Sequence, residues 1–295
     1  MRIGTNTAAI NTYSNLKSAN ASKAGSLAKL SSGLRINKAG DDAAGLSISE
    51  KMKNQISGLT QATRNAQDGI SLIQTAEGGL SETHSILNRM RDLSVQASNE
   101  TNSTEDLKAI DSEMTSLTTE IDRIAKTTKF NGKGLLFDAT VPVAPAVADY
   151  ESTFTLQIGA NTATEDAMAV TIADMDKIGL GLDDATDPTK GLLNVAEAGK
   201  ETANAISNIK VLDSAIEKVS TQRTELGASQ NRLEHTINNL STTKENLSEA
   251  NSRITDVDMA EEMSAFTKSN ILSQAATSML AQANQMPQSV LSLLQ

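Results

Sequence analysis

Two features of the sequence could supply reactive groups: a pair of adjacent carboxylates and two isolated histidines. Asp41 and Asp42 stand beside glycines in the stretch SSGLRINKAGDDAAGLS, and paired carboxylates can act as an acid and a base. Nothing near them indicates a substrate pocket, and acidic residues are favoured at helix N-termini. We therefore expect Asp41 and Asp42 to cap a helix that begins near Ala43.

The histidines lack the neighbours that a metal or catalytic site requires. His84 and His235 each lie in a helix-like pattern, and neither belongs to an HExxH motif. The chain has no cysteine, which excludes disulfides and thiolate metal sites. It also contains no Walker loop and no GxGxxG motif. We predict that the protein is not an enzyme and uses no cofactor.

Net charge and composition limit the kinds of partner that we expect the protein to bind. The 295 residues include 26 Lys and Arg against 36 Asp and Glu, a formal net charge of −10, which disfavours nucleic-acid binding. No apolar run of about 18 residues exists, so we expect no membrane insertion. The N-terminus has no cleavable signal pattern, so we expect the chain either to stay in the cytoplasm or to leave by a route that cleaves nothing.

Apolar residues recur every seven positions in long stretches of the sequence. A strict spacing of seven predicts a left-handed coiled coil, although a bundle helix with one apolar edge is the alternative. A helix over 212–254 would be about 65 Å long at ~1.5 Å per residue, which predicts an elongated molecule. The late series is Leu212, Val219, Leu226, Leu233, Leu240, Leu247 and Ile254. The early series is Met52, Leu59, Ala66, Ile73, Leu80 and Leu87.

A third helix and a short β region lie between these series. Apolar steps of three and four from Leu107 to Ile124 indicate the helix, with Ser103 or Thr104 as its N-cap and FNGKG as its end. Two alternating runs, around 154–158 and 168–172, predict a β-hairpin. The expected fold class is mainly α: an elongated, hairpin-like subunit with long coiled-coil helices and a small β-hairpin region in the middle of the chain.

Both chain ends carry apolar stripes at helical spacing. Near the start the stripe runs from Ala9 to Leu34, with polar lapses at Asn20 and Lys23; near the end it runs from Leu272 to Leu293. We expect two helices that pair with each other. Further leucines lie off the second stripe, so one helix pair cannot cover them all, and a helix that is apolar on several sides needs several neighbours.

We therefore hypothesise that both ends are largely disordered in the monomer and fold when many copies pack together. The residues expected in this contact are Leu27, Leu30, Leu34, Leu272, Met279, Leu280, Val290, Leu291 and Leu294.

Four stretches, in order, resemble signatures of one family. They are LSSGLRINKAGDDAAGLSISEKM at 30–52, FNGKGLL at 130–136, LGASQNRLEHTINNL at 226–240 and SNILSQAATSMLAQANQMPQSVLSLLQ at 269–295. Together they resemble bacterial flagellin, the filament subunit of the flagellum. The resemblance implies a terminal coiled-coil domain formed by 1–43 and 255–295, and a helical rod domain over 44–254 with 139–190 as its variable tip.

The resemblance also implies a function and partners. It implies a subunit that polymerises with itself, is exported unfolded through the filament channel, and is located outside the cell. It implies an export chaperone that binds the C-terminal arm, and filament cap and hook-associated proteins.

In some hosts a vertebrate toll-like receptor binds a patch of flagellin that corresponds here to Arg89, Leu93, Gln96 and Glu113. Residues 88, 92 and 94 depart from the commonest form of that motif, and subunit contact is the alternative role of the patch. A hook–filament junction protein is the alternative function, and a cytoplasmic signalling coiled coil fits less well.

Overall fold

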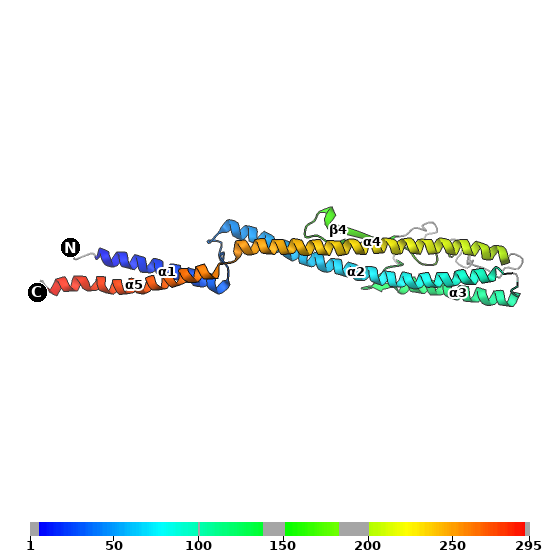
Figure 1. Ribbon diagram of the computed structural model, residues 1–295, viewed down its shortest axis with the longest axis horizontal. Coiled ribbons are helices and arrows are strands. Elements are labelled where there is room, and N and C mark those ends of the chain that lie inside the picture. Colours follow the sequence, from blue (N-terminus) through cyan, green and yellow to red (C-terminus); the bar gives the residue numbers. More distant parts are fainter. Residues whose placement is uncertain (1–5, 100, 138–150, 183–200, 293–295) are drawn as a thin grey trace. The chain divides into compact units, whose positions relative to one another are not determined.

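Figure 1 shows the computed structural model, which describes residues 6–99, 101–137, 151–182 and 201–292; the side chains of 151, 201–204 and 286–292 are not described. Its long helices are α1 (Thr7–Ser32), α2 (Ala43–Ala97), α3 (Thr104–Thr127), α4 (Glu201–Thr255) and α5 (Met259–Ser292). Its strands form two antiparallel hairpins, β1 (Lys129–Phe130) with β2 (Lys133–Gly134) and β3 (Glu151–Gln157) with β4 (Ala167–Ala173). The predicted mainly α fold with a small β region is confirmed.

The chain forms two compact units. The terminal unit comprises Met1–Ser57 and Thr243–Gln295, and the central unit comprises Gly58–Thr242. These units divide far inside α2 and α4. The boundaries that we expected at 43/44 and 254/255 lie one residue inside the ends of these helices, next to the breaks between helices. The division into a terminal and a rod domain at those breaks stays a prediction.

The core of the central unit is built by the two heptad series and by α3. Leu212, Val219, Leu226 and Leu233 of α4 are fully or almost fully buried. They share one hydrophobic cluster with Ile73, Leu80 and Leu87 of α2 and with Leu107, Met114 and Ile121 of α3. Ion pairs flank this cluster, such as Arg91 with Asp213 at 2.7 Å. The heptads therefore mark the buried face of each helix, as the sequence predicts.

Local chemistry ends α3 and starts the first hairpin. Ser103 and Asp106 form a reciprocal capping box at the N-terminus of α3, as expected. In the turn between β1 and β2, Asn131 has φ 49° and Gly132 has φ 80°. Both values lie in the left-handed region that Asn and Gly tolerate best, so the Asn-Gly pair suits a tight hairpin turn.

The second hairpin packs on α2 and α4. The inward residues of β4, Met168, Val170 and Ile172, are buried in the shared core. Asn65 of α2 donates to the Gln157 carbonyl at 2.9 Å. Gly69 gives Leu156 room, since a Cβ there would lie 2.3 Å from a Leu156 methyl. The hairpin predicted around 154–158 and 168–172 is confirmed, in the register Leu156 to Met168.

Gln222 of α4 forms hydrogen bonds with the edge of β4 that does not pair with β3. Its Oε1 accepts from the Ala173 amide at 3.1 Å, and its Nε2 donates to the Thr171 carbonyl at 3.0 Å. The side chain is only 5% exposed, so these backbone groups have little access to water. A buried amide side chain thus takes the place of a third strand.

We expect Gln222→Ala to lower the free energy of unfolding by about 1–3 kcal/mol, because the variant leaves a donor and an acceptor unsatisfied. Thermal or urea unfolding of the monomer measures the loss. Gln230→Ala on the same helix, whose side chain bonds only Glu234 one turn away, is the matched control and should cost less than about 0.5 kcal/mol. Equal losses in both variants would contradict the assigned role of Gln222.

Candidate functional site

The terminal unit is held together by a polar seam between α1 and α5. The helices run antiparallel, since Lys23 donates to Asn270 at 2.9 Å while Asn6 donates to the Ala283 carbonyl at 2.8 Å. Ser273 donates to Asn20 at 2.8 Å between these two contacts. The polar lapses of the N-terminal stripe, Asn20 and Lys23, are therefore residues that contact α5. The predicted pairing of the two ends is confirmed.

The seam covers little apolar surface. Of the 33 buried hydrophobic residues in the described chain, only Ile36 and Ala283 belong to the terminal unit. Of the eleven large hydrophobic side chains that are strongly exposed in the described chain, nine belong to it. These nine are Ile10, Tyr13, Leu27, Ile48, Met259, Met263, Ile271, Leu272 and Met279. The apolar surface of this unit is therefore left open.

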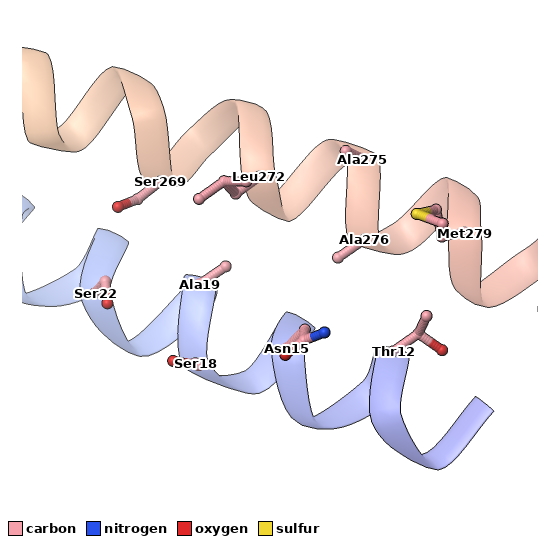
Figure 2. Close-up of a pocket in the computed structure, with 10 residues that line it drawn as sticks. All are labelled: Thr12, Asn15, Ser18, Ala19, Ser22, Ser269, Leu272, Ala275, Ala276 and Met279. Carbon is pink, nitrogen blue, oxygen red and sulfur yellow. The ribbon is translucent and has the colours of Figure 1, made fainter. Parts of the chain in front are cut away.

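A groove separates α1 and α5 along part of the seam (Figure 2). Its volume is about 400 Å³. Small side chains line it from α1, among them Thr12, Asn15 and Ala19, while Leu272 and Met279 line it from α5. Because Leu272 and Met279 are 50% and 63% exposed, they contact the facing helix only in part. The groove is thus a place where apolar side chains border open space.

The structure corrects the predicted C-terminal stripe. The stripe included Leu272 and Met279, but these side chains are exposed; Ser269 is buried instead, and Leu280, placed off the stripe, is half-buried. On α1, Leu27 is 55% exposed, while Leu30 is half-buried. The seam is rotated because small and polar residues, rather than the largest apolar ones, allow the closest approach of the two helices.

The remaining predicted contact residues have different positions. Leu34 is half-buried and forms a β-bridge with Asp256. Val290 and Leu291 lie on α5, but their side chains are not among those described, and Leu294 lies outside the described residues.

The loop between α1 and α2 ties these helices to the end of α4. Gly33, at φ 72°, caps α1, and its carbonyl accepts from the Val257 amide at 3.1 Å. Arg35 donates from its guanidinium to the Ile254 carbonyl at 2.6 Å and from its amide to the Thr255 carbonyl at 2.6 Å. These carbonyls end α4, where the helix dipole favours a cation.

The two carboxylates of this loop have separate structural roles. Asp42 Oδ1 accepts from the Gly45 amide at 2.9 Å, so Asp42 caps α2 as expected. Asp41 does not cap α2: its Oδ2 accepts from the Lys38 amide at 2.9 Å and the Asn37 amide at 3.0 Å. These donors, Lys38 first, hold the pKa of Asp41 below its ordinary value. The prediction was wrong for Asp41 because the preceding loop turns back onto it.

The predicted receptor patch, formed by Arg89, Leu93, Gln96 and Glu113 of α2 and α3, is only partly exposed. Arg89 donates twice to Glu113 Oε1, at 2.8 and 3.0 Å, and both side chains are exposed. Gln96 is also exposed. Leu93 is 2% exposed and belongs to the core, so it supports the helices and offers no surface. Val95, 50% exposed, is an apolar neighbour that the motif did not indicate.

A second group of carboxylates lies beside the C-terminal half of α3. Asp176 is 5% exposed and accepts from the amides of Ile178 and Gly179 at 2.8 and 2.7 Å. Burial, then the charge of Asp176, raise the pKa of Asp174 to about 6, and the nearby Asp122 acts in the same direction. Lys126, which donates to Asp122 at 2.7 Å, opposes this shift.

Within the described residues, neither the loop that contains Asp41 and Asp42 nor the cluster of Asp122, Asp174 and Asp176 forms a recognisable reactive site. Within the described residues, no group of three or more His, Cys, Asp or Glu side chains could hold a metal ion. In the same part of the chain, no helix combines the length and apolar character needed to cross a membrane. The feature that stands out is the uncovered apolar surface of the terminal unit.

Comparison with known proteins agrees with this picture. Residues 3–140 match the bacterial flagellin N-terminal helical region, and residues 209–294 match the C-terminal helical region. Flagellin of Bacillus subtilis (strain 168) is 53% identical over the full length of both chains. The flagellar filament 33 kDa core protein of Treponema phagedenis is 47% identical, again over both full chains. The chain therefore belongs to the bacterial flagellin family.

A solved structure shares the fold at much lower identity. A putative flagellar hook-associated protein from Vibrio parahaemolyticus aligns with a TM-score of 0.57 and 16% identity, covering 73% of this chain and all of the other. Likeness at that identity concerns the fold alone.

We expect the contribution of Asp174 to the stability of the central unit to fall as the pH rises from about 4 to 7. The folded-state pKa of Asp174, about 6, lies above the ordinary 3.8, so the folded chain binds this proton more tightly than the unfolded chain. Asp174→Asn keeps an acceptor for the Asp176 amide and cannot ionise. Its melting temperature should therefore exceed that of the parent at pH 7, by a margin that shrinks towards pH 4.

Thermal unfolding of the monomer at pH 4, 5.5 and 7 measures this margin. Asp68→Asn, on an exposed position of α2, is the matched control and should follow the parent at each pH. A margin for Asp174→Asn that does not change with pH would contradict the assignment.

Proposed function

We propose that the chain is a structural subunit that polymerises into a bacterial flagellar filament for swimming motility. The observation that carries the proposal is the apolar surface of the terminal unit, which holds nine of the eleven strongly exposed large hydrophobic side chains in the described chain. Monomeric proteins rarely leave so much apolar surface open without a partner. Relatives named as flagellin and flagellar filament core protein, at 53% and 47% identity, support the same role.

Neighbouring copies of the chain cover this surface. Leu27, Leu272 and Met279 enter contacts between copies, and the groove between α1 and α5 accepts side chains from the next copy. The C-terminal leucines Leu291 and Leu294, together with Val290, extend the same contact on the basis of sequence. Leu30, Leu34 and Leu280 stabilise the helix pair from within, since they are half-buried in the subunit.

Folding of the terminal helices is coupled to assembly. A helix in water gains most of its stability from packing of its apolar face, and the polar seam supplies little such packing in one copy. A chain whose ends are weakly folded suits export in an unfolded state through the filament channel, to a final location outside the cell. The same apolar ends need a chaperone before export, bound through the C-terminal arm.

The remaining partners follow from position in the filament. A helical polymer of this kind needs a cap protein at the growing end and hook-associated proteins at its base. The exposed side chains of Arg89, Gln96 and Glu113 form a surface for subunit contact, and the same surface is the candidate for recognition by the toll-like receptor for flagellin. Leu93 contributes only by fixing α2 beneath that surface.

The alternative is a hook–filament junction protein. It has weaker support, because the hook-associated structure from Vibrio parahaemolyticus is only 16% identical and matches in fold alone. Full-length identity of 53% to a flagellin favours the filament subunit.

We expect Leu272→Asn to raise the monomer concentration needed for polymerisation about tenfold or more, because a half-exposed leucine loses about 1 kcal/mol or more of burial and an amide must be desolvated. Purified monomer with short filament seeds, followed by light scattering and electron microscopy, measures the change. Ile206→Asn on α4, equally exposed at 50%, is the control and should assemble much more like the parent. Equal loss in both variants would argue against the terminal unit as the main contact.

Deletion of residues 291–295 should leave a soluble chain with a folded central unit that does not polymerise. Normal filaments from this truncation would contradict the role assigned to the C-terminal leucines.

We expect Arg89→Ala to reduce seeded polymerisation while leaving thermal unfolding nearly unchanged, since an exposed ion pair contributes about 0–1 kcal/mol to stability. Arg123→Ala is the matched control, because Arg123 pairs with Glu120 at 2.5 Å and has a similarly exposed side chain. It should polymerise like the parent. Unchanged assembly of Arg89→Ala would show that this patch makes no subunit contact.

A further inference from the structure

The methionines of the chain fall into two classes. Met90, Met114, Met168 and Met175 are buried in the central unit, with exposures of 0–4%. Met259, Met263 and Met279 of the terminal unit are 50%, 50% and 63% exposed. Met52 is intermediate, and the side chains of the other two of the ten methionines are not described. Apart from Met52, the described methionine side chains are thus buried in the central unit and exposed in the terminal unit.

Exposure decides which thioethers an oxidant can reach. A peroxide oxidises methionine in one two-electron step: the sulfur attacks one peroxide oxygen, the S–O bond forms and the O–O bond breaks. The departing oxygen takes up a proton and leaves as water when the oxidant is hydrogen peroxide. The product, methionine sulfoxide, is polar and chiral, and it disrupts apolar contacts. Buried thioethers react slowly because the oxidant must first enter the core.

Met279 lies where such a change would matter. It borders the groove between α1 and α5, beside Ala276 and across from Thr12 (Figure 2). Met259 and Met263 lie one turn apart at the start of α5, so they share one side of the helix. All three side chains contribute to the apolar surface that assembly covers under the proposed function.

We propose that Met259, Met263 and Met279 form an oxidation-sensitive site: peroxide converts them to sulfoxides in the free chain, and the sulfoxides block polymerisation. This inference rests on the proposed function of the terminal unit. Because assembly covers the same side chains, the assembled subunit is protected. Sensitivity to oxidation is therefore a property of the chain before assembly.

The first experiment treats purified full-length monomer with hydrogen peroxide and measures sulfoxide at each methionine by peptide mass spectrometry. Sulfoxide should form at least about tenfold faster at the three exposed methionines than at Met90 or Met114, following accessibility. Seeded polymerisation should be lost in step with that oxidation, while the melting temperature of the central unit stays constant. Preformed filaments given the same treatment should gain much less sulfoxide at the three positions.

Three further tests distinguish the effect of sulfoxide at these three methionines from the effect of oxidation elsewhere in the chain. The triple variant M259L/M263L/M279L changes little side-chain volume, and peroxide treatment should leave its polymerisation at the level of the same variant untreated. The matched variant M90L/M114L, which removes buried methionines, should lose polymerisation after peroxide as the parent does. Methionine sulfoxide reductases of both stereospecificities should restore polymerisation to the oxidised parent, whatever the behaviour of the variants.

Two outcomes would overturn the inference. One is normal polymerisation of a parent chain that is fully oxidised at the three positions. The other is a triple variant that polymerises when untreated and loses that polymerisation after peroxide, as the parent does. Failure of the untreated parent to add to seeds would instead refute the proposed function, so the two failures are distinguishable.

Discussion

The contact between α1 and α5 depends on small and polar side chains, and this leaves many of the large apolar side chains of both helices exposed. Lys23 with Asn270 and Asn20 with Ser273 fix the pairing and its direction. Such bonds are specific but contribute only about 0.5–1.5 kcal/mol each, less than a buried apolar core would give. The pairing of α1 and α5 is therefore specific, although the terminal unit buries little apolar surface. Under the proposed function, other copies of the chain supply the remaining stability.

The central unit, in contrast, is held together mainly by buried apolar side chains. Two heptad series and α3 bury a continuous core, and the second hairpin joins this core through β4. Where β4 lacks a neighbouring strand, Gln222 supplies the missing donor and acceptor. Because of this core, we expect the central unit to be stable without partners. This division between the units accounts for both the placement of the methionines and the placement of the exposed apolar residues.

Sequence periodicity predicted the parts of the fold that depend on burial along one face. The series from Leu212 and from Leu59, the hairpin and the capping box follow from spacing alone, because burial repeats with the helix or strand period. The rotation of the α1–α5 seam could not be predicted, since it depends on which small residues allow close approach. The burial of Leu93, which the motif places in the predicted receptor patch, could not be foreseen because a motif does not reveal burial. Asp41 was misassigned because its partners lie in a loop whose path the sequence does not specify.

Amide hydrogen exchange on the monomer and on the assembled filament distinguishes terminal helices that fold on assembly from helices that are already folded in the monomer. Residues 7–32 and 259–292 should be weakly protected in the monomer and strongly protected in the filament. The core of the central unit, including the α4 segment around Leu212 to Leu233, should be protected in both states. Strong protection of both terminal helices in the isolated monomer would contradict the account.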